Sequence, residues 1–333
     1  MSSPHQSEID PELEDEDTDA SIPAAFEAYA EESLPNATPR GHGKDGTLFA
    51  RFARTGSKTR LVRDRFSVPL HLTGTLSHDP LGPTACIQEP TGGVTHGDRH
   101  EITIEAIDEA TAVATTQSAT KIHSMHSDYA HLDTTITVDE SSYLEYLPGA
   151  VIVNEDARLL QTTEINLAST SVLLTTDIFA PDGLSAHTPF SFDHYRSQID
   201  VYQENALTYT DVTNIEPDTA SENNCPPAQF TGDNRIGTLY IFTPDPLSAA
   251  PVVSDRCNCT LADLVEQIRS CIQDGSDDNP GLTAGVTRLP ADTGICVRAI
   301  GETTDMLQGL FNEVRESFRQ IAFGISTPTD RWY

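Results

Sequence analysis

The stretch that decides the fold runs from Gly92 to Lys121 and reads GGVTHGDRHEITIEAIDEATAVATTQSATK. It opens with two glycines, which adopt backbone angles that other residues avoid. After a second turn at Gly97-Asp98, apolar residues alternate with polar ones from residue 102 to 106, as in a strand with one buried face. A short acidic turn at 108–109 leads into a second β-rich run that ends in small polar residues. The stretch therefore predicts two strands, each preceded by a turn.

The pattern of strand, polar turn and strand recurs three more times along the chain. The four runs are led by Ile102, Ile136, Ile165 and Ile199, which lie about 30 residues apart. One such unit cannot bury its apolar side chains alone, so stacking of the units into layers is the natural solution. The repeat predicts a mainly β fold of elongated, stacked β-sheets with β-helix-like repeats.

Two helices are expected near the C-terminus. Residues 260–273 carry apolar side chains at helical spacing and begin with Thr260, a residue type that often caps helix N-termini. Residues 304–321 form a second apolar stripe, which includes Phe311 and Phe318. The predicted fold class is thus mainly β with two C-terminal α-helices.

The composition of the chain changes near residue 45. Residues 1–45 are acidic and interrupted by prolines, which predicts a disordered tail with a short helical segment from Ala24 to Glu32. Residues 46–325 are expected to form a single β-rich domain, and residues 326–333 a C-terminal tail.

The charge balance is strongly acidic. The sequence has 20 Lys and Arg against 51 Asp and Glu, which gives a formal net charge of −31. Such a charge opposes binding to the phosphates of nucleic acid. Because the acid is spread over the whole chain, adaptation to high salt is favoured over a site for cations or for a basic partner. No apolar run approaches the about 20 residues of a membrane span, and the N-terminus lacks a secretory pattern. We expect a soluble cytoplasmic protein with no membrane or nucleic-acid partner.

One segment of this acidic chain is basic. Five arginines lie close together in the first predicted strands: Arg51, Arg54, Arg60, Arg63 and Arg65. They have two interpretations, a solvated strand face or a docking patch for an acidic partner.

Catalytic motifs are not found in the sequence. It contains no P-loop, nucleophile elbow, HExxH motif or Rossmann glycine string, so we do not expect an enzyme. Metal binding is the alternative, because His123, His126 and His131 lie close together and imidazole binds nickel and zinc well. A strand would place His123 and His126 on opposite faces, whereas a loop would allow the histidines to gather. Solvated loop histidines are the simpler interpretation.

Small polar residues precede Lys121. Thr115, Thr116, Gln117 and Thr120 suit either a water-filled passage or an ordinary threonine-rich sheet face. Lys121 must be solvated or paired, because burial of an unpaired charge is costly. If the two strands fold back on each other, we expect Asp98 to pair with Lys121 or Arg99.

This ordered set of residues resembles the signature of the urease accessory protein UreD family, also called UreH. The family pattern of two glycines, Gly-Asp-Arg and Thr-Thr-Gln-x-x-x-Lys falls on Gly92, Gly93, Gly97, Asp98, Arg99, Thr115, Thr116, Gln117 and Lys121. A second block, residues 144–167, is similar to the family's LEWLP region. The chain departs from the family at Leu184 and at Thr188-Pro189, where the family has an arginine and Gly-Glu, so contacts made through those residues are not expected here.

The resemblance implies a non-catalytic chaperone or scaffold. Such a protein binds apo-urease with UreF and UreG and supports nickel insertion into the urease active site. The resemblance implies no tightly bound cofactor, with nickel only in transit through an internal passage. The UreF surface is expected on exposed apolar parts of the C-terminal helices, with Phe311 and Phe318 as candidates; the alternative is that both belong to the core. Two alternatives stay open: a metal-binding chaperone that itself carries nickel, and a β-solenoid carbohydrate-active enzyme.

Overall fold

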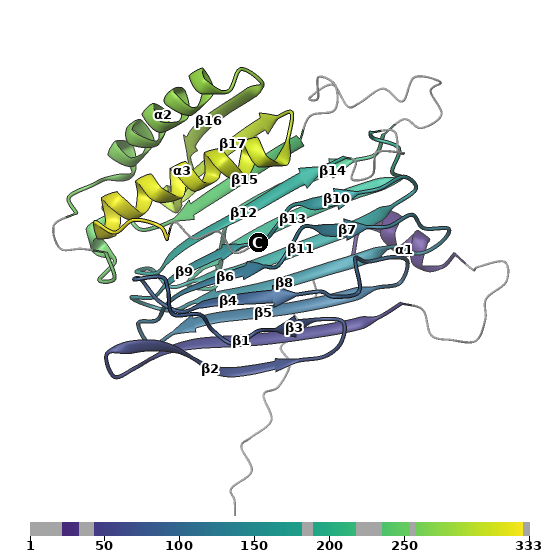
Figure 1. Cartoon of the computed structure of the whole chain (residues 1–333), viewed down its shortest axis with the longest axis horizontal. Helices are drawn as coiled ribbons and strands as arrows, with labels where there is room; N and C mark the ends of the chain where they lie inside the picture. Colours follow the sequence, from purple (N-terminus) through teal and green to yellow (C-terminus); the bar gives the residue numbers. More distant parts are fainter. Residues whose placement is uncertain (1–21, 33–42, 182–188, 218–234, 254–256, 329–333) are drawn as a thin grey trace, which may run out of the picture.

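The computed structural model describes residues 22–32, 43–181, 189–217, 235–253 and 257–328, and strands dominate these ranges (Figure 1). The first of two sheets has the order β14 (Ala206–Ile215), β13 (His194–Gln203), β11 (Arg158–Leu167), β8 (Ala130–Val138), β5 (Arg99–Ile107), β1 (Asp45–Thr55) and β2 (Lys58–Phe66). The second has the order β16 (Leu282–Arg288), β17 (Gly294–Gly301), β15 (Arg235–Phe242), β12 (Val172–Ala180), β9 (Tyr143–Leu147), β6 (Thr111–Thr116), β4 (Thr84–Gln88) and β3 (His71–Leu72). The short strands β7 (Thr120–Ile122) and β10 (Val151–Val153) pair beside it.

The predicted repeat is confirmed, and the strands of its first three units alternate between the two sheets. β5, β8, β11 and β13 run parallel in the first sheet, while β6, β9 and β12 run parallel in the second. Each of the first three repeats therefore gives one strand to each layer, whereas the two strands of the fourth repeat, β13 and β14, pair antiparallel as a hairpin within the first sheet. This is the β-helix-like stacking that the sequence predicts.

The register of the repeat differs from the one that the leading isoleucines suggest. The aligned ladder is Ile104, Ile136, Ile165 and Val201, whereas Ile102 lies opposite Thr134 and Ile199 opposite Thr163. A shift of two residues keeps each side chain on the same face, because side chains in a strand alternate with period two. The predicted faces are correct, although the predicted alignment of the first and last runs is wrong by two residues.

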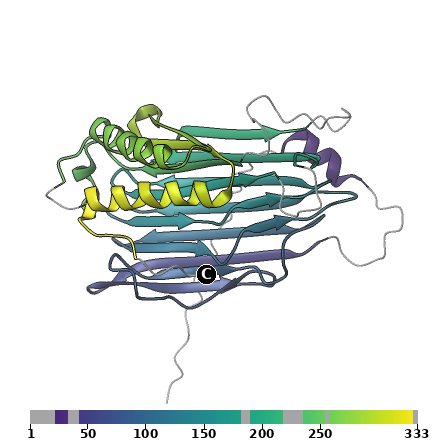
Figure 2. The same cartoon turned by 45° about the horizontal axis from the view of Figure 1, so that its top comes forward.

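The core lies in two layers. One apolar cluster joins the inner faces of the sheets, with Leu48, Ile104 and Ile136 from the first and Leu144 and Leu173 from the second. The second cluster lies between the outer face of the second sheet and the helices α2 (Leu261–Asp278) and α3 (Thr304–Phe323). Both helices confirm the prediction, and both lie on one side of the stacked strands (Figures 1 and 2).

The helix ends follow from local hydrogen bonds. The Asp263 amide donates to the Thr260 hydroxyl at 3.2 Å, and Asp263 Oδ2 accepts from the Thr260 amide at 3.0 Å, so Thr260 caps α2 as predicted. Thr303 caps α3 by accepting from the Met306 amide. Two short 3₁₀ helices, η1 (Leu247–Ala249) and η2 (Pro290–Asp292), complete the described elements of this region.

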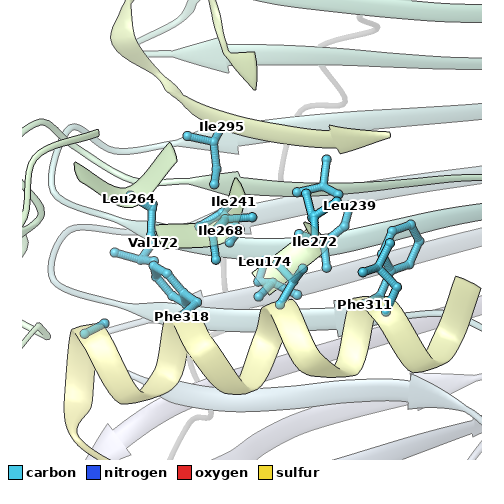
Figure 3. Close-up of a cluster of buried hydrophobic side chains, with 14 of the residues drawn as sticks. Val172, Leu174, Leu239, Ile241, Leu264, Ile268, Ile272, Ile295, Phe311 and Phe318 are labelled. Atoms are coloured by element: carbon cyan, nitrogen blue, oxygen red, sulfur yellow. The ribbon is translucent and has the colours of Figure 1, made fainter. Parts of the chain in front are cut away.

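The assignment of Phe311 and Phe318 to an exposed partner surface is wrong. Their side chains are 4% and 0% exposed and point from α3 into the cluster on the second sheet (Figure 3). A β-carbon built on Gly237 of β15 would lie 2.8 Å from the Phe311 ring, which shows how closely helix and strand approach. The exposed residues of α3 are Asp305, Gly309, Asn312, Glu313 and Gln320, so its outer face is polar.

The helix α1 (Ala24–Ala30) falls within the segment predicted to be helical. Phe26 is fully buried, and its ring lies 5.1 Å from that of Tyr129 and 4.5 Å from that of His194. Arg158 lies over the Tyr29 ring, 4.5 Å from its centroid. The tail predictions for residues 1–21, 33–42 and 329–333, and the family departure at Leu184 and Thr188, lie outside the described residues.

Candidate functional site

The Gly92-Gly93 turn lies against the strand that carries Lys121. The Val94 amide donates to the Lys121 carbonyl at 2.8 Å, and the His123 amide donates to the Val94 carbonyl at 2.8 Å. Gly93 has a φ of +133°, and a β-carbon there would lie 2.4 Å from the Lys121 carbonyl oxygen. Because a side chain would collide with this backbone, only glycine fits. The two ends of the signature therefore meet through their backbones.

Asp98 organises the next turn and does not pair with Lys121 or Arg99. Its side chain is 1% exposed, accepts from the Lys44 amide at 2.7 Å and from the Thr95 amide at 2.9 Å, and lies 3.3 Å from the Lys44 ammonium. The predicted pairing is wrong, because the Asp98 carboxylate pairs instead with Lys44, which lies just before β1. A buried carboxylate with two amide donors and one ammonium is a structural turn cap.

Arg99 has partners of its own. Its guanidinium lies 3.0 Å from Asp128 Oδ1, donates to the Tyr129 carbonyl at 2.5 Å and lies over the Tyr129 ring at 4.2 Å from the centroid. Arg99 therefore joins β5 to the loop before β8. Lys121 is exposed, and no carboxylate of the described residues lies within 4.0 Å of its ammonium.

The small polar residues before Lys121 fall into two groups: some form hydrogen bonds that join neighbouring segments, and others line a cavity. Thr115 donates to the Leu147 carbonyl at 2.8 Å, which joins β6 to β9. Thr116 accepts from the Gly149 amide at 2.7 Å and also borders a cavity, as do Gln117 and Thr120. Thr115 and Lys121 do not line this cavity.

The cavity lies between the two sheets and has a volume of about 100 Å³. The first sheet contributes His100, Thr134, Gln161 and Thr163 to its wall; the second contributes Tyr146, Thr175 and Asp177. A volume of this size holds about three water molecules. Exposed Gln117 and Ser118, with half-buried Glu89, also line it, so the cavity reaches the surface beside the family signature.

Burial controls the charge of the groups around this cavity. Desolvation lowers the pKa of His100 to about 4, against the opposing effect of the Asp98 charge. Burial also raises the pKa of Tyr146 to about 12 and the pKa of Asp177 above its ordinary value. The Nε2 atom of His100 has no hydrogen-bond partner among the described residues. The site thus offers a neutral imidazole, hydroxyls, an amide and the Asp177 carboxyl group in a cavity whose remaining lining is mainly apolar.

The three candidate metal ligands do not converge. His123 Nε2 lies 3.1 Å from the Gly92 carbonyl oxygen, and His131 Nε2 lies 2.8 Å from the Thr162 hydroxyl. His126 is exposed. Across the described ranges, no three His, Cys, Asp or Glu side chains lie in an arrangement that would hold a metal ion.

A buried ionic cluster that was not predicted from the sequence lies under α3 and consists of Asp79, Glu145, Arg315 and Arg319. Arg319 Nε donates to Glu145 Oε1 at 2.6 Å and Arg319 Nη2 donates to Oε2 at 2.8 Å; two further bonds reach Asp79. Arg315 Nε donates to Glu145 Oε2 at 2.7 Å, and Tyr143 also donates to this carboxylate. Burial opposes ionisation of Glu145, but the charges of Arg315 and Arg319 and their hydrogen bonds exceed this effect and hold its pKa at about 2.

A sequence signal for this cluster exists. Glu145 is the one charged residue of Tyr143–Leu147, a strand whose other side chains are apolar or aromatic, and Arg315 and Arg319 are one helical turn apart. A carboxylate inside a buried strand requires a cation. Its partner could not be named, because the residues lie 174 positions apart.

The comparisons with known proteins agree on one family. The family model described as UreD urease accessory protein matches residues 44–333. The chain is 42% identical to the urease accessory protein UreD of Natronomonas pharaonis, over 94% of this chain and 100% of the relative. It is 38% identical to the UreD of Haloquadratum walsbyi, over 94% of this chain and 98% of the relative. The UreD of Photorhabdus laumondii is 28% identical, over 86% and 85% of the two chains.

Two further findings concern the acidic composition of the chain and its helices. The first two of these relatives are haloarchaeal, which fits the interpretation of the acidic composition as an adaptation to salt. Within the described ranges, every helix is too short or too polar to cross a membrane.

Proposed function

This chain belongs to the UreD family of urease accessory proteins, and we propose that it acts as a non-catalytic scaffold in urease maturation. In this proposal the chain binds apo-urease together with UreF and UreG. The assembly then delivers nickel to the urease active site. Family membership supports the maturation role, and the relatives' names as accessory proteins support a helper rather than a catalyst.

The cavity beside the family signature is the observation that carries the nickel step. Thr116, Gln117 and Thr120 border it, and they belong to the segment that resembles the family pattern. Burial keeps His100 uncharged near neutral pH, which is the form of imidazole that binds metals. The same burial makes a resident dication costly, because few charged groups offset its desolvation. These properties favour brief passage of an ion over storage.

A cavity-filling variant tests the passage. Thr163 of β11 lines the cavity, and Thr135 of β8 points to the outer face of the same sheet. We expect Thr163→Leu to lower the nickel content and activity of urease matured with this chain, because the larger side chain fills the space. Thr135→Leu is the matched control and leaves both unchanged.

Binding and passage are measured separately. Each variant is co-produced with tagged UreF in about molar KCl, where an acidic protein is screened, and the purified complex is quantified before urease nickel is assayed. Wild-type nickel loading by Thr163→Leu would reject the passage and leave the scaffold role intact. Failure of the wild-type chain to purify with UreF would reject the partner assignment itself.

A further inference from the structure

The strand β2 forms a free edge of the first sheet. Within the described residues it pairs with β1 alone, at the end of the strand order (Figure 1). An antiparallel edge strand presents half of its backbone amides and carbonyls away from its neighbour. Such an edge can accept a further strand from another chain.

A β-bulge gathers three arginines on one face of this edge. Arg51 lies opposite Arg63, but the next residue, Phe52, lies opposite Leu61, so Val62 is an extra residue in β2. Without the bulge, Arg60 and Arg63 would point to opposite faces, because side chains alternate along a strand. With it, Arg60, Arg63 and Arg65 all lie on the outer face while Leu61 packs towards the core.

These three arginines lack acidic partners. Arg51 and Arg54, on the neighbouring strand, pair with Glu105 and Glu109. In contrast, no carboxylate of the described residues lies within 4.0 Å of Arg60, Arg63 or Arg65, and all three are exposed. Arg63 lies over the Phe49 ring, 5.7 Å from its centroid. In a chain with 51 acidic residues and a net charge of −31, a row of cations without carboxylate partners is unusual.

Protection of the edge against aggregation does not explain this surface. A row of charged side chains is enough for that protection, and it requires no exposed apolar side chain on the same edge. The same edge also exposes apolar side chains: Val62 is 48% exposed, Phe66 39% and Val68 82%. Exposed apolar groups beside a basic row are a feature of a binding surface.

We propose that β2 is a docking strand for an extended acidic segment of a partner protein, which adds to the edge of the first sheet. The segment's backbone would bond to the free side of β2, and its carboxylates would pair with Arg60, Arg63 and Arg65. Docking of a second copy of β2 is disfavoured, because it would set two arginine rows against each other. Nucleic acid is disfavoured by the net charge of the chain. This inference does not depend on the proposed role in urease maturation.

A short peptide serves as the probe. A dye-labelled peptide of alternating glutamate and valine, about eight residues long, has the length of a typical strand. Its binding to the full chain is measured by fluorescence anisotropy in about 2 M KCl, where exposed charges more than a few ångströms apart are screened. We expect saturable binding, with at least about tenfold weaker affinity for the combined Arg60→Ser, Arg63→Ser and Arg65→Ser variant.

Matched controls separate charge, backbone pairing and folding. The combined Arg→Lys variant at the same positions keeps the charge and is expected to keep most of the affinity. A peptide N-methylated at alternate residues keeps its carboxylates but loses amide donors, so it is expected not to bind. Unfolding curves of both variants check that the fold is unchanged.

Four results would overturn the proposal. The first is that the serine variant binds the peptide as tightly as the wild type does, and the second is that the N-methylated peptide binds as tightly as the unmodified one. The third is that a single-stranded oligonucleotide binds more tightly than the peptide. The fourth is that the chain's own acidic residues occupy β2. The last is tested in the full chain by replacing the Asp and Glu residues among positions 1–21 with Asn and Gln. If peptide affinity then rises about tenfold, the occupant is this chain's own segment and not a partner.

Discussion

Arg319 of α3 donates to both carboxylate oxygens of Glu145 of β9, and neither side chain reaches solvent. The two residues lie 174 positions apart in the chain, so the contact fastens the last helix to the middle of the strand stack. Asp79 accepts two more bonds from the same guanidinium. Loss of either partner would leave a buried charge with only part of its compensation, since Glu145 would keep Arg315 and Arg319 would keep Asp79.

Replacement of Arg319 by methionine is expected to lower the free energy of unfolding by about 3–5 kcal/mol, the usual cost of breaking a buried ion pair from one side. Arg269→Met is the matched control, because Arg269 pairs with Glu266 on the exposed face of α2. Its cost should stay below about 1 kcal/mol. Denaturant unfolding at fixed KCl measures both variants. Equal losses would show that the buried cluster does not stabilise the fold.

The contribution of Glu145 should depend on pH. Its pKa in the fold is about 2, against an ordinary value of 4.5. Because the folded pKa is the lower one, the stabilisation is fully present above about pH 4.5 and is lost as the pH falls towards 2. The difference in unfolding free energy between wild type and Glu145→Gln should therefore shrink across this window. A difference that stays constant between pH 6 and 3 contradicts the assignment.

His100 should behave as a neutral buried group. Its pKa in the fold is about 4, against an ordinary 6.5, because burial disfavours the imidazolium. Between these values the unfolded chain binds a proton that the folded chain does not, so stability falls by about 3 kcal/mol as the pH drops from 6.5 to 4. His100→Gln should remove this part of the pH dependence. Direct titration of the imidazole by NMR provides the check, and a midpoint near 6.5 would show that His100 is not buried in the neutral form.

The close approach at Gly93 predicts a large effect of a small substitution. Gly93→Ala would place a β-carbon 2.4 Å from the Lys121 carbonyl at a φ of +133°. We expect a loss of at least about 2 kcal/mol in unfolding free energy, or loss of soluble protein. Gly285→Ala is the control, since nothing lies within 4 Å of its β-carbon position. If both variants melt at the wild-type temperature, the turn tolerates a side chain.

Lys121→Ala should separate function from folding. The side chain is exposed and lacks a described acidic partner, so the unfolding free energy should change by less than about 0.5 kcal/mol. If the ammonium serves the passage or a partner, nickel-dependent urease activity falls while soluble yield stays at the wild-type level. A loss of solubility as severe as that of Gly93→Ala would instead assign Lys121 a structural role.

Local patterns in the sequence were sufficient to predict the elements of this fold. Alternation from residue 102 to 106 predicts a strand because a pleated backbone turns successive side chains to opposite faces. The stripe that contains Phe311 and Phe318 predicts α3, and Thr260 predicts the start of α2, because these features depend on neighbours within one or two turns. The repeat of about 30 residues indicates stacked layers, because one unit alone cannot bury its apolar face.

Tertiary structure decided which elements meet. Period-two alternation fixes the face of a side chain but not the partner strand, so the placement of β5 and β6 in different sheets and the Ile104–Ile136 register come only from the assembled fold. An apolar stripe shows which side of α3 is apolar but not whether a sheet or a partner covers it. The sequence therefore left both a core position and a partner surface open for Phe311, and the structure places it in the core. The cavity, the Lys44–Asp98 contact and the Arg319–Glu145 pair join residues far apart in the chain. Such contacts depend on how the layers pack on one another. No local property of the sequence predicts which distant residues will meet.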